Sequence, residues 1–254
     1  MASEVKTNKI SPVGSTVTLG DASDTFVIPA SVTLDVNGII DLTGATKTGF
    51  PGGLAGVIRY TAISTVWNKA NRETALGGII ITKVIVEVQG AGGSGSSGNT
   101  AGNTMGGAGG GYARKLLDVS DTITATAVVG VGGTTVGVTN NPGVAGGLSN
   151  FGETDGSGGW ATVIGNGGAA GTTAGGTGSA GGTSSGGDIQ ITGGNGTYGG
   201  YMGSGGDSFM GNAGITVEST TGVAGTGYGA GGGGGRDNNS GVGTNGSVIV
   251  WEYQ

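Results

Sequence analysis

The sequence contains no cysteine and no histidine, and only four of its 254 residues are proline. Without cysteine the chain forms no disulfide and carries no thiolate nucleophile. Without histidine it lacks the commonest general base and the commonest metal ligand. Charged residues amount to 10% and aromatic residues to 5%, so few side chains are left for chemistry. These absences argue against an enzyme, and we expect no catalytic residue, no cofactor and no metal ion.

Long apolar runs and positive charge are scarce as well. No apolar run approaches the roughly 18 residues that span a bilayer, and residues 1–6 lack the apolar segment of a secretory signal. The formal net charge is −6, which disfavours nucleic acid as a partner. Beyond Lys115 the one basic residue is Arg236, whereas nine acidic residues lie between Asp118 and Glu252. We therefore expect neither membrane insertion nor nucleic-acid binding.

Glycine is what the sequence has in excess. Only ten of the 65 glycines precede residue 90, and from there on about one residue in three is glycine. Collagen needs a strict Gly-X-Y period and abundant proline, and this chain has neither. A disordered Gly/Ser linker is disfavoured by the mean hydropathy of +0.08 and by β-branched segments between the glycine runs. The class that remains is an ordered glycine-rich structure.

The first fifty residues show period-two patterns separated by turn signals. Residues 15–19 and 31–36 alternate polar and apolar side chains, and Pro29 and Asn37-Gly38 follow strand-like runs. These patterns predict short strands in a hairpin-like meander. Because so short a segment with few large side chains makes a thin core, we expect it to associate with partner chains.

Further strands are predicted on both sides of residue 90. Residues 57–67 predict one strand and residues 79–89 another; between them Asn68 is suited to cap one or two helical turns ended by Gly77-Gly78. Strand-like segments recur among the glycine runs, at residues 112–119, 122–129, 188–192 and 247–253. We expect the last of these to pair with residues 79–89.

The glycine doublets predict a structure held by backbone hydrogen bonds. Fixing a glycine costs more conformational entropy than fixing other residues, and little apolar area is available to offset that cost. Helices with three residues per turn make no internal hydrogen bonds, so their N–H and C=O groups are available to neighbours, which approach closely when Cβ atoms are absent. A bundle of polyglycine II helices would satisfy these groups. A glycine-rich β-sandwich has a similar composition and remains an alternative.

Six motifs together resemble bacteriophage tail-fibre proteins that carry a C-terminal glycine-rich domain. They occur in the family's order across most of residues 79–254: Thr82–Gly93, Gly106–Lys115, Thr122–Gly133, Gly146–Gly152, Gly229–Gly234 and Gly246–Tyr253. The N-terminal Gly14–Asp21, Phe26–Pro29 and Asn37-Gly38 look like the short β-modules of phage fibre stalks. The chain departs from the family at residues 68–76, where many relatives pass directly from the tryptophan into a Pro-Gly turn.

The resemblance implies an all-β fold in three parts. These are an N-terminal attachment and trimeric β-stalk module at 1–56, connecting strands with a short helix at 57–89, and a glycine-rich distal domain at 90–254 with polyglycine II helices and flanking strands. It also implies a virion adhesin on a host-recognition fibre, with the chain as a homotrimer. The N-terminal part would attach to other phage tail or baseplate proteins, and loops of the distal domain would bind a host surface protein or glycan.

The few large side chains between glycine runs are the candidate receptor-binding residues. Aromatic side chains dominate binding hot spots, but the same residues would also fill apolar gaps among the glycines, and the sequence leaves both roles open. The set is Trp160, Tyr198, Tyr201, Met202, Phe209, Met210, Tyr228 and Arg236.

Other motifs are weak. Gly90-x-Gly92-x-x-Gly95 with Asp118 matches a dinucleotide fingerprint, but no helix is predicted after the glycines. Residues 193–198 begin like a calcium-binding repeat and have a tyrosine where the aspartate belongs. Glu153 and Asp155 form a candidate carboxylate pair for glycan hydrolysis, although solvated carboxylates are the simpler interpretation. The alternatives to an adhesin are a capsid or neck decoration fibre and an ice-binding protein.

Overall fold

The computed structural model describes residues 53–61, 63–98, 104–122, 124–138, 140–173, 178–199, 203–216 and 221–254. The expected N-terminal strands at residues 15–42 and candidate residues Tyr201 and Met202 therefore lie outside the described residues. The described chain is predominantly β, as expected, with a single helix, α1 (Lys69–Ala75). Residues 50–254 form one compact unit.

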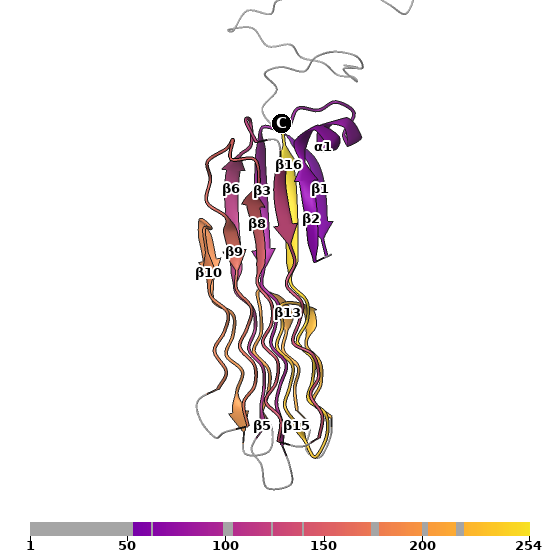
Figure 1. The fold of residues 1–254 in the computed structure, drawn as a ribbon, viewed down its shortest axis with the longest axis vertical. Coiled ribbons are helices and arrows are strands. Elements are labelled where there is room, and N and C mark those ends of the chain that lie inside the picture. Colours follow the sequence, from indigo (N-terminus) through magenta and orange to yellow (C-terminus); the bar gives the residue numbers. More distant parts are fainter. Residues whose placement is uncertain are drawn as a thin grey trace, which may run out of the picture. The chain divides into compact units, whose positions relative to one another are not determined.

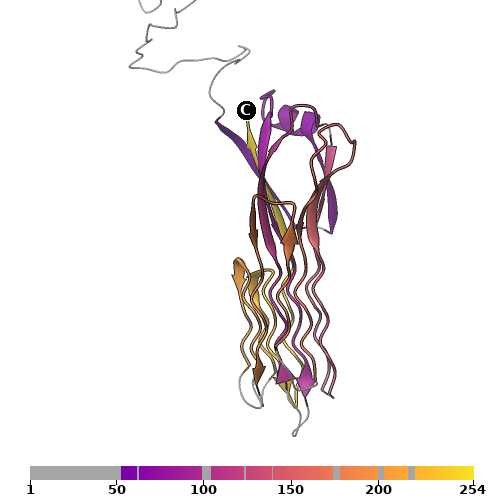
Figure 2. The same cartoon turned by 90° about the vertical axis from the view of Figure 1, so that its left-hand side faces the viewer.

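Two five-stranded antiparallel sheets face each other in this unit (Figure 2). The first sheet has the strand order β1 (Leu54–Tyr60), β16 (Ser247–Tyr253), β3 (Lys83–Gln89), β6 (Tyr112–Asp118) and β11 (Ile189–Ile191). The second has the order β10 (Ser184–Ser185), β9 (Val163–Gly165), β8 (Ser149–Glu153), β7 (Thr124–Val128) and β2 (Ser64–Asn68). Three two-stranded ladders complete the structure: β12 (Tyr198–Gly199) with β5 (Thr104–Met105), β13 (Met210–Asn212) with β14 (Thr226–Tyr228), and β15 (Gly235–Arg236) with β4 (Ser97–Gly98).

The side-chain core lies between the two sheets. Strand β3 alternates, with Val84, Val86 and Val88 fully buried, as expected for a strand with one face toward a core. The expected pairing of the C-terminal strand is confirmed, because β16 pairs antiparallel with β3. The second sheet contributes Trp67, Phe151 and Val163 among others to the same cluster. Each of the two sheets thus contains strands from residues 57–89 and strands from residues 90–254.

One strand prediction was wrong. Residues 57–67 were expected to form a single strand, but the chain leaves β1 at Tyr60 and enters β2 at Ser64. Strand β1 pairs with β16 in the first sheet and β2 with β7 in the second. The residue pattern did not reveal the change of sheet, because strand-forming residues continue without interruption through residues 57–67.

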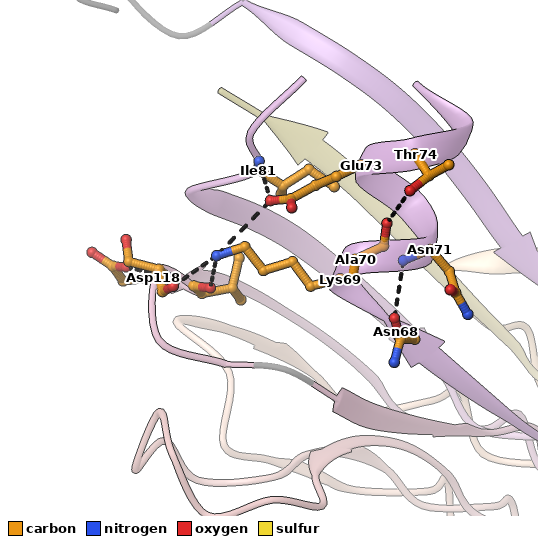
Figure 3. Close-up of polar contacts among 10 residues, drawn as sticks. Asn68, Lys69, Ala70, Asn71, Glu73, Thr74, Ile81 and Asp118 are labelled. Atoms are coloured by element: carbon orange, nitrogen blue, oxygen red, sulfur yellow. Dashed lines mark hydrogen bonds and ion pairs between the residues drawn. The ribbon is translucent and has the colours of Figure 1, made fainter. Parts of the chain in front are cut away.

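Helix α1 closes the end of the sandwich, and its predicted cap is confirmed. Asn68 accepts a hydrogen bond from the Asn71 N–H at 3.0 Å (Figure 3). Lys69 donates to the carbonyl oxygens of Val119 and Ser120 at 3.0 and 2.7 Å. Glu73 accepts from the Ile81 N–H at 2.9 Å. The helix is too short to be stable alone, so these contacts fix it against neighbouring segments.

Beyond the sheets, the chain continues as side-by-side extended segments (Figure 1). Segment 90–98 is fully buried, and its successive N–H groups donate to three neighbours in rotation over 2.8–3.1 Å. Gly90, Gly93 and Ser96 donate to segment 104–111; Ala91, Ser94 and Ser97 donate to segment 141–147; and Gly92 and Gly95 donate to segment 238–246. Its carbonyl groups accept from three further segments, 130–137, 165–173 and 229–237.

Two other inner segments have the same environment. Segment 104–111 donates in rotation to 193–197, 229–232 and 166–169. In segment 229–235, Gly229 and Ala230 donate to Asn245 and to the Thr244 hydroxyl, and residues 231–235 donate to 203–206, 93–96 and 223. Both segments are buried. We call the three inner segments and their extended neighbours the glycine-rich array.

Backbone contact explains why the inner segments are glycine. A Cβ added to Gly92 would lie 1.9 Å from the Ala230 carbonyl oxygen, and one added to Gly107 would lie 2.2 Å from the Gly93 oxygen. Most side-chain-bearing residues of the inner segments are small, such as the fully buried Ala108; the larger buried Met105 lies at the end of segment 104–111. Along most of its length the array is therefore packed backbone against backbone.

Candidate functional site

The end of the array away from the sheets gathers chain segments from six regions of the sequence. Strands β5 and β15 lie at this end (Figure 1), paired with β12 and β4. Hydrogen bonds place further residues at this end of the array. The Ser97 N–H donates to the Asn141 carbonyl, and the Ser96 N–H donates to the Met105 carbonyl. We call the described residues at this end the rim: Gly98, Thr104, Asn140, Asn141, Thr172, Tyr198, Gly199, Arg236 and Asp237.

Buried and partly buried hydrogen bonds hold the rim in place. The Thr216 hydroxyl lies 2.7 Å from the Gly203 carbonyl oxygen and 2.8 Å from that of Gly234. The Ser97 hydroxyl donates to the Gly137 carbonyl and accepts from the Asn141 N–H. These contacts link separate segments directly below the rim, so side chains on it project from a fixed backbone.

Two rim residues are left-handed turn residues. Asn140 has φ 46° and Asp237 has φ 52°, a region that asparagine and aspartate enter more readily than other residues with side chains. Each lies where the chain turns at the end of an array segment. Asparagine and aspartate are thus selected here by turn geometry, which is a structural reason for part of the rim's polarity.

Tyr198 and Arg236 are the sequence-predicted candidates that the structure places on the rim. Tyr198 is 40% exposed and lies in β12, opposite the buried Met105. Arg236 lies in β15, with its Nε 3.9 Å from an Asp237 carboxylate oxygen. A phenol combines an apolar ring with a hydroxyl, and a guanidinium binds carboxylates and phosphates. The rim thus presents the Tyr198 side chain to solvent, whereas the Arg236 side chain is only 16% exposed and lies beside the Asp237 carboxylate.

Phe209, Met210 and Tyr228 lie elsewhere, on the β13–β14 hairpin. Met210 and Tyr228 are cross-strand partners, and Phe209 stacks on Tyr112 with ring centroids 4.1 Å apart. The Arg59 guanidinium lies 5.3 Å from the centre of the Tyr228 ring, within cation–π range. Burial raises the pKa of Tyr112 to about 12, and Glu87 adds to the increase. We call this hairpin the ledge; Figure 1 shows β13 between the sheets and the rim.

Trp160 lies among the sandwich residues rather than with the other candidates. Its ring stacks on buried Phe151 at 5.6 Å between centroids and an interplanar angle of 2°. Its indole N–H donates to the Thr122 hydroxyl at 3.2 Å, and the ring packs against the core cluster. Of the two roles that the sequence left open, this environment favours packing for Trp160.

The carboxylate pair Glu153 and Asp155 organises the loop before Trp160. Glu153 accepts hydrogen bonds from the N–H groups of Gly158 and Gly159. Asp155 accepts from the Thr124 N–H at 2.7 Å and from Ser157. The two carboxylates therefore accept hydrogen bonds from backbone N–H groups of their own loop and of Thr124, and they stabilise the turn.

The weak nucleotide and calcium motifs find no supporting geometry. The N–H groups of Gly90, Gly92 and Gly95 all donate to neighbouring array segments, so none is left to bind a pyrophosphate. Asp118 bonds to Ser120, which lowers the pKa of the Asp118 carboxyl. Among the described residues, no three histidine, cysteine, aspartate or glutamate side chains are grouped as metal ligands.

Sequence reasoning missed one buried charged site. Glu252 is fully buried and accepts from Trp67 and Arg72. Its place in an alternating C-terminal strand gave a weak signal, since a carboxylate on the inward face of such a strand requires a partner. The sequence does not show that Trp67 is one of these partners, because Trp67 reaches Glu252 only after the chain changes sheets beyond Tyr60.

No family model matches the chain, and a search of curated proteins finds no match. In the part of the chain that the structure describes, no helix has the length and apolar character of a membrane span.

Proposed function

We propose that this chain is a bacteriophage tail-fibre protein that binds the host cell surface. In this proposal it is a homotrimeric adhesin of the virion and has no enzymatic activity. Its N-terminal part attaches to other tail or baseplate proteins, and its glycine-rich part recognises a host protein or glycan. The proposal rests on the six motifs that resemble phage fibres and on the arrangement of the array and its rim.

The glycine-rich array is best described as a polyglycine II lattice. The observation that carries this interpretation is the rotation of hydrogen-bond partners with a period of three residues in segment 90–98. A helix with three residues per turn presents its groups in three directions, and six surrounding segments then complete its donors and acceptors. Such a lattice keeps its form without a side-chain core, so residues at its end can vary without affecting its interior.

The polarity of this unit suits a fibre tip. Gln254 donates its N–H to the Gly53 carbonyl, so the chain enters and leaves the unit at the end that carries the sheets. The rim lies at the opposite end. A protein attached through its N-terminal residues would thus present the rim, with Tyr198 and Arg236, away from the attachment point. The net charge of −6 reduces nonspecific adhesion to anionic surfaces.

The test is binding of the labelled full-length chain to cells of the bacterium that the virus infects. Replacing Tyr198 and Arg236 together by alanine should reduce cell binding at least tenfold, because interface residues of these types often contribute about 2 kcal/mol or more. The matched control is the ledge pair Phe209→Ala and Tyr228→Ala, which should bind as well as the parent.

Two outcomes would contradict the proposal. If the full-length chain binds no susceptible cells and antibodies against the glycine-rich part leave virus adsorption intact, the adhesin function is wrong. Labelled particles with the chain on the capsid or neck would then favour a decoration fibre. If binding occurs and only the ledge variant loses it, the adhesin function stands and the rim is the wrong surface.

A further inference from the structure

The outward face of the first sheet carries a continuous row of apolar side chains. Cross-strand pairing aligns Val57 with Trp251, Trp251 with Ile85, and Ile85 with Leu116 across four neighbouring strands. Since side chains alternate between faces and Val84, Val86 and Val88 point into the core, this row points away from it. Ile249 and Ile189 lie in the next row, where their cross-strand neighbours are Arg59, Glu87 and Arg114. We call the six apolar residues the outer face.

The outer face is accessible in the single chain. Val57 is 45% exposed, Leu116 53% and Ile189 48%. Two shallow hollows lie on it, of about 350 and 180 Å³, and Ile85 and Leu116 line both. Scattered apolar residues are normal on a protein surface, whereas a contiguous patch of this kind marks an interaction site.

The second sheet differs on its outward face. Thr124, Thr126 and Val128 occupy that side of β7, and Asn150 and Ile164 lie in line with Val128 across β8 and β9. Val66 is exposed there at 59%, next to Thr126. Of the two outward faces, the first therefore carries the more continuous row of apolar side chains.

Charged residues on and beside the outer face are balanced by one another. Arg114 lies 3.7 Å from Glu87, and Lys83 is the cross-strand partner of Asp118. Arg59 also lies on this face, beside Ile249 and over the Tyr228 ring. Asp188 lies next to it and accepts from the Leu116 N–H. Groups of both signs thus leave little net charge on the face, although the chain is acidic. A strongly charged partner has nothing to complement here. A neighbouring copy that carries the same apolar row and the same balance of charges can pack here without adding a strong charge to the contact.

The area is close to what association requires. Four strands of seven residues and one of three, about 4.8 Å apart and rising about 3.3 Å per residue, span roughly 490 Å² in plan. The ledge, which contacts this sheet through Tyr112 and Arg59, adds to that area. Stable interfaces bury roughly 600–1,000 Å² per partner, so the plan area of the sheet approaches the lower end of that range.

From these observations we infer that the outer face packs against a second copy of this chain. The inference rests on the homotrimer of the proposed function, in which the outer face of each chain contacts a neighbouring copy around the threefold axis. Leu116 and Ile85 are central to the contact, and the ledge lies at its border.

The natural absence of cysteine permits a direct test with single-cysteine variants of the full-length chain. Leu116→Cys lies within the outer face, and Val66→Cys is the matched control, a similarly exposed aliphatic residue on the other sheet. At high dilution, a short bismaleimide should link Leu116→Cys chains into dimers at least tenfold more than Val66→Cys chains. A monofunctional maleimide should label the thiol of the Leu116→Cys variant at least tenfold more slowly than that of the Val66→Cys variant.

Ile189→Cys provides a second position if Leu116→Cys fails to fold, as judged by its circular dichroism spectrum and melting temperature. Free labelling at the face position without intermolecular linkage would overturn the inference. Slow labelling without linkage would also overturn it, because residues 1–52 or another molecule would then cover the face. Host-cell binding of the same variants separates the two proposals: cell binding without linkage contradicts only the interface, and linkage without cell binding contradicts only the adhesin function.

Discussion

Trp67 in the second sheet donates its indole N–H to Glu252 in the first sheet, at 2.9 Å between nitrogen and oxygen. The same carboxylate accepts from Arg72 of α1 through two bonds of 2.8 Å. One buried side chain thus joins both sheets and the helix. Because an ionised carboxylate in a dry interior is costly unless paired, these partners are required for Glu252 to be there at all.

Removal of the Glu252 carboxylate should strongly destabilise the sandwich. In Glu252→Ala the Trp67 N–H and the Arg72 guanidinium lose their acceptor, and we expect a loss of about 3 kcal/mol in the free energy of unfolding. Denaturant unfolding followed by tryptophan fluorescence measures it. Glu87→Ala is the control, since its partly exposed pair with Arg114 should contribute at most about 1 kcal/mol. Equal losses in the two variants would contradict the role assigned to Glu252.

A single methyl group should distinguish the inside of the array from its surface. In Gly92→Ala the new Cβ meets the Ala230 carbonyl oxygen at 1.9 Å, so the backbones must separate, and we expect a loss of at least about 3 kcal/mol. A Cβ added to Gly137 has no atom within 4 Å, and Gly137→Ala should change stability by about 1 kcal/mol or less. Thermal unfolding of both variants tests this; a tolerated Gly92→Ala would show that the array is not closely packed.

Stability should fall at high pH because of buried tyrosines. Burial raises the pKa of Tyr60 to about 12 from its usual value of 10.0, with a smaller contribution from Glu252, while Arg72 opposes the shift. Below pH 10 the phenol keeps its proton in both folded and unfolded chains, so its contribution is constant. Between about pH 10 and about pH 12 the unfolded chain loses the proton first, and the stability decreases.

Urea unfolding at a series of pH values measures this slope. Tyr60→Phe should reduce it, and the double variant with Tyr112→Phe should reduce it further, because burial raises the pKa of Tyr112 to about 12 as well. An unchanged slope in the double variant would mean that other groups cause the alkaline loss of stability.

Trp160 and Tyr198 should respond oppositely in stability and in cell binding. Trp160→Ala removes the stack on Phe151 and should cost about 3 kcal/mol, with cell binding retained at temperatures where the variant is folded. Tyr198→Ala removes an exposed side chain and should cost less than about 1 kcal/mol while weakening cell binding. Melting curves and binding curves of the two variants decide the matter. Loss of binding in a folded Trp160→Ala variant would return Trp160 to the candidate contact residues.

The sequence predicted the strands that carry a clear alternation. The strand predicted over residues 79–89 forms over Lys83–Gln89 and pairs with residues 247–253 as expected, and Asn68 caps α1. These elements depend on local pattern and on turn chemistry, which one sequence displays. The switch of sheet after Tyr60 was missed, because it depends on which distant strands, β16 and β7, are available to pair with each half.

The candidate site was predictable only in part. Isolated large side chains among glycines were visible in the sequence, but their positions depend on the length of each array segment. Tyr198 lies on the rim, Tyr228 on the ledge and Trp160 against the core, although all three are set in similar glycine-rich surroundings. Composition does not distinguish these three residues, because their positions depend on how far each segment extends along the array before the chain turns.

The central claim is that backbone hydrogen bonds hold the glycine-rich half together. Each N–H group of Gly231–Gly235 donates to a carbonyl of another part of the chain over 2.7–2.9 Å. Amide hydrogen exchange of the full-length chain, followed by mass spectrometry of peptides from this segment, tests the claim directly. We predict exchange slowed to the rate of global unfolding, comparable to that of β3 in the sandwich core. Exchange at the rate of an unstructured glycine peptide would contradict it.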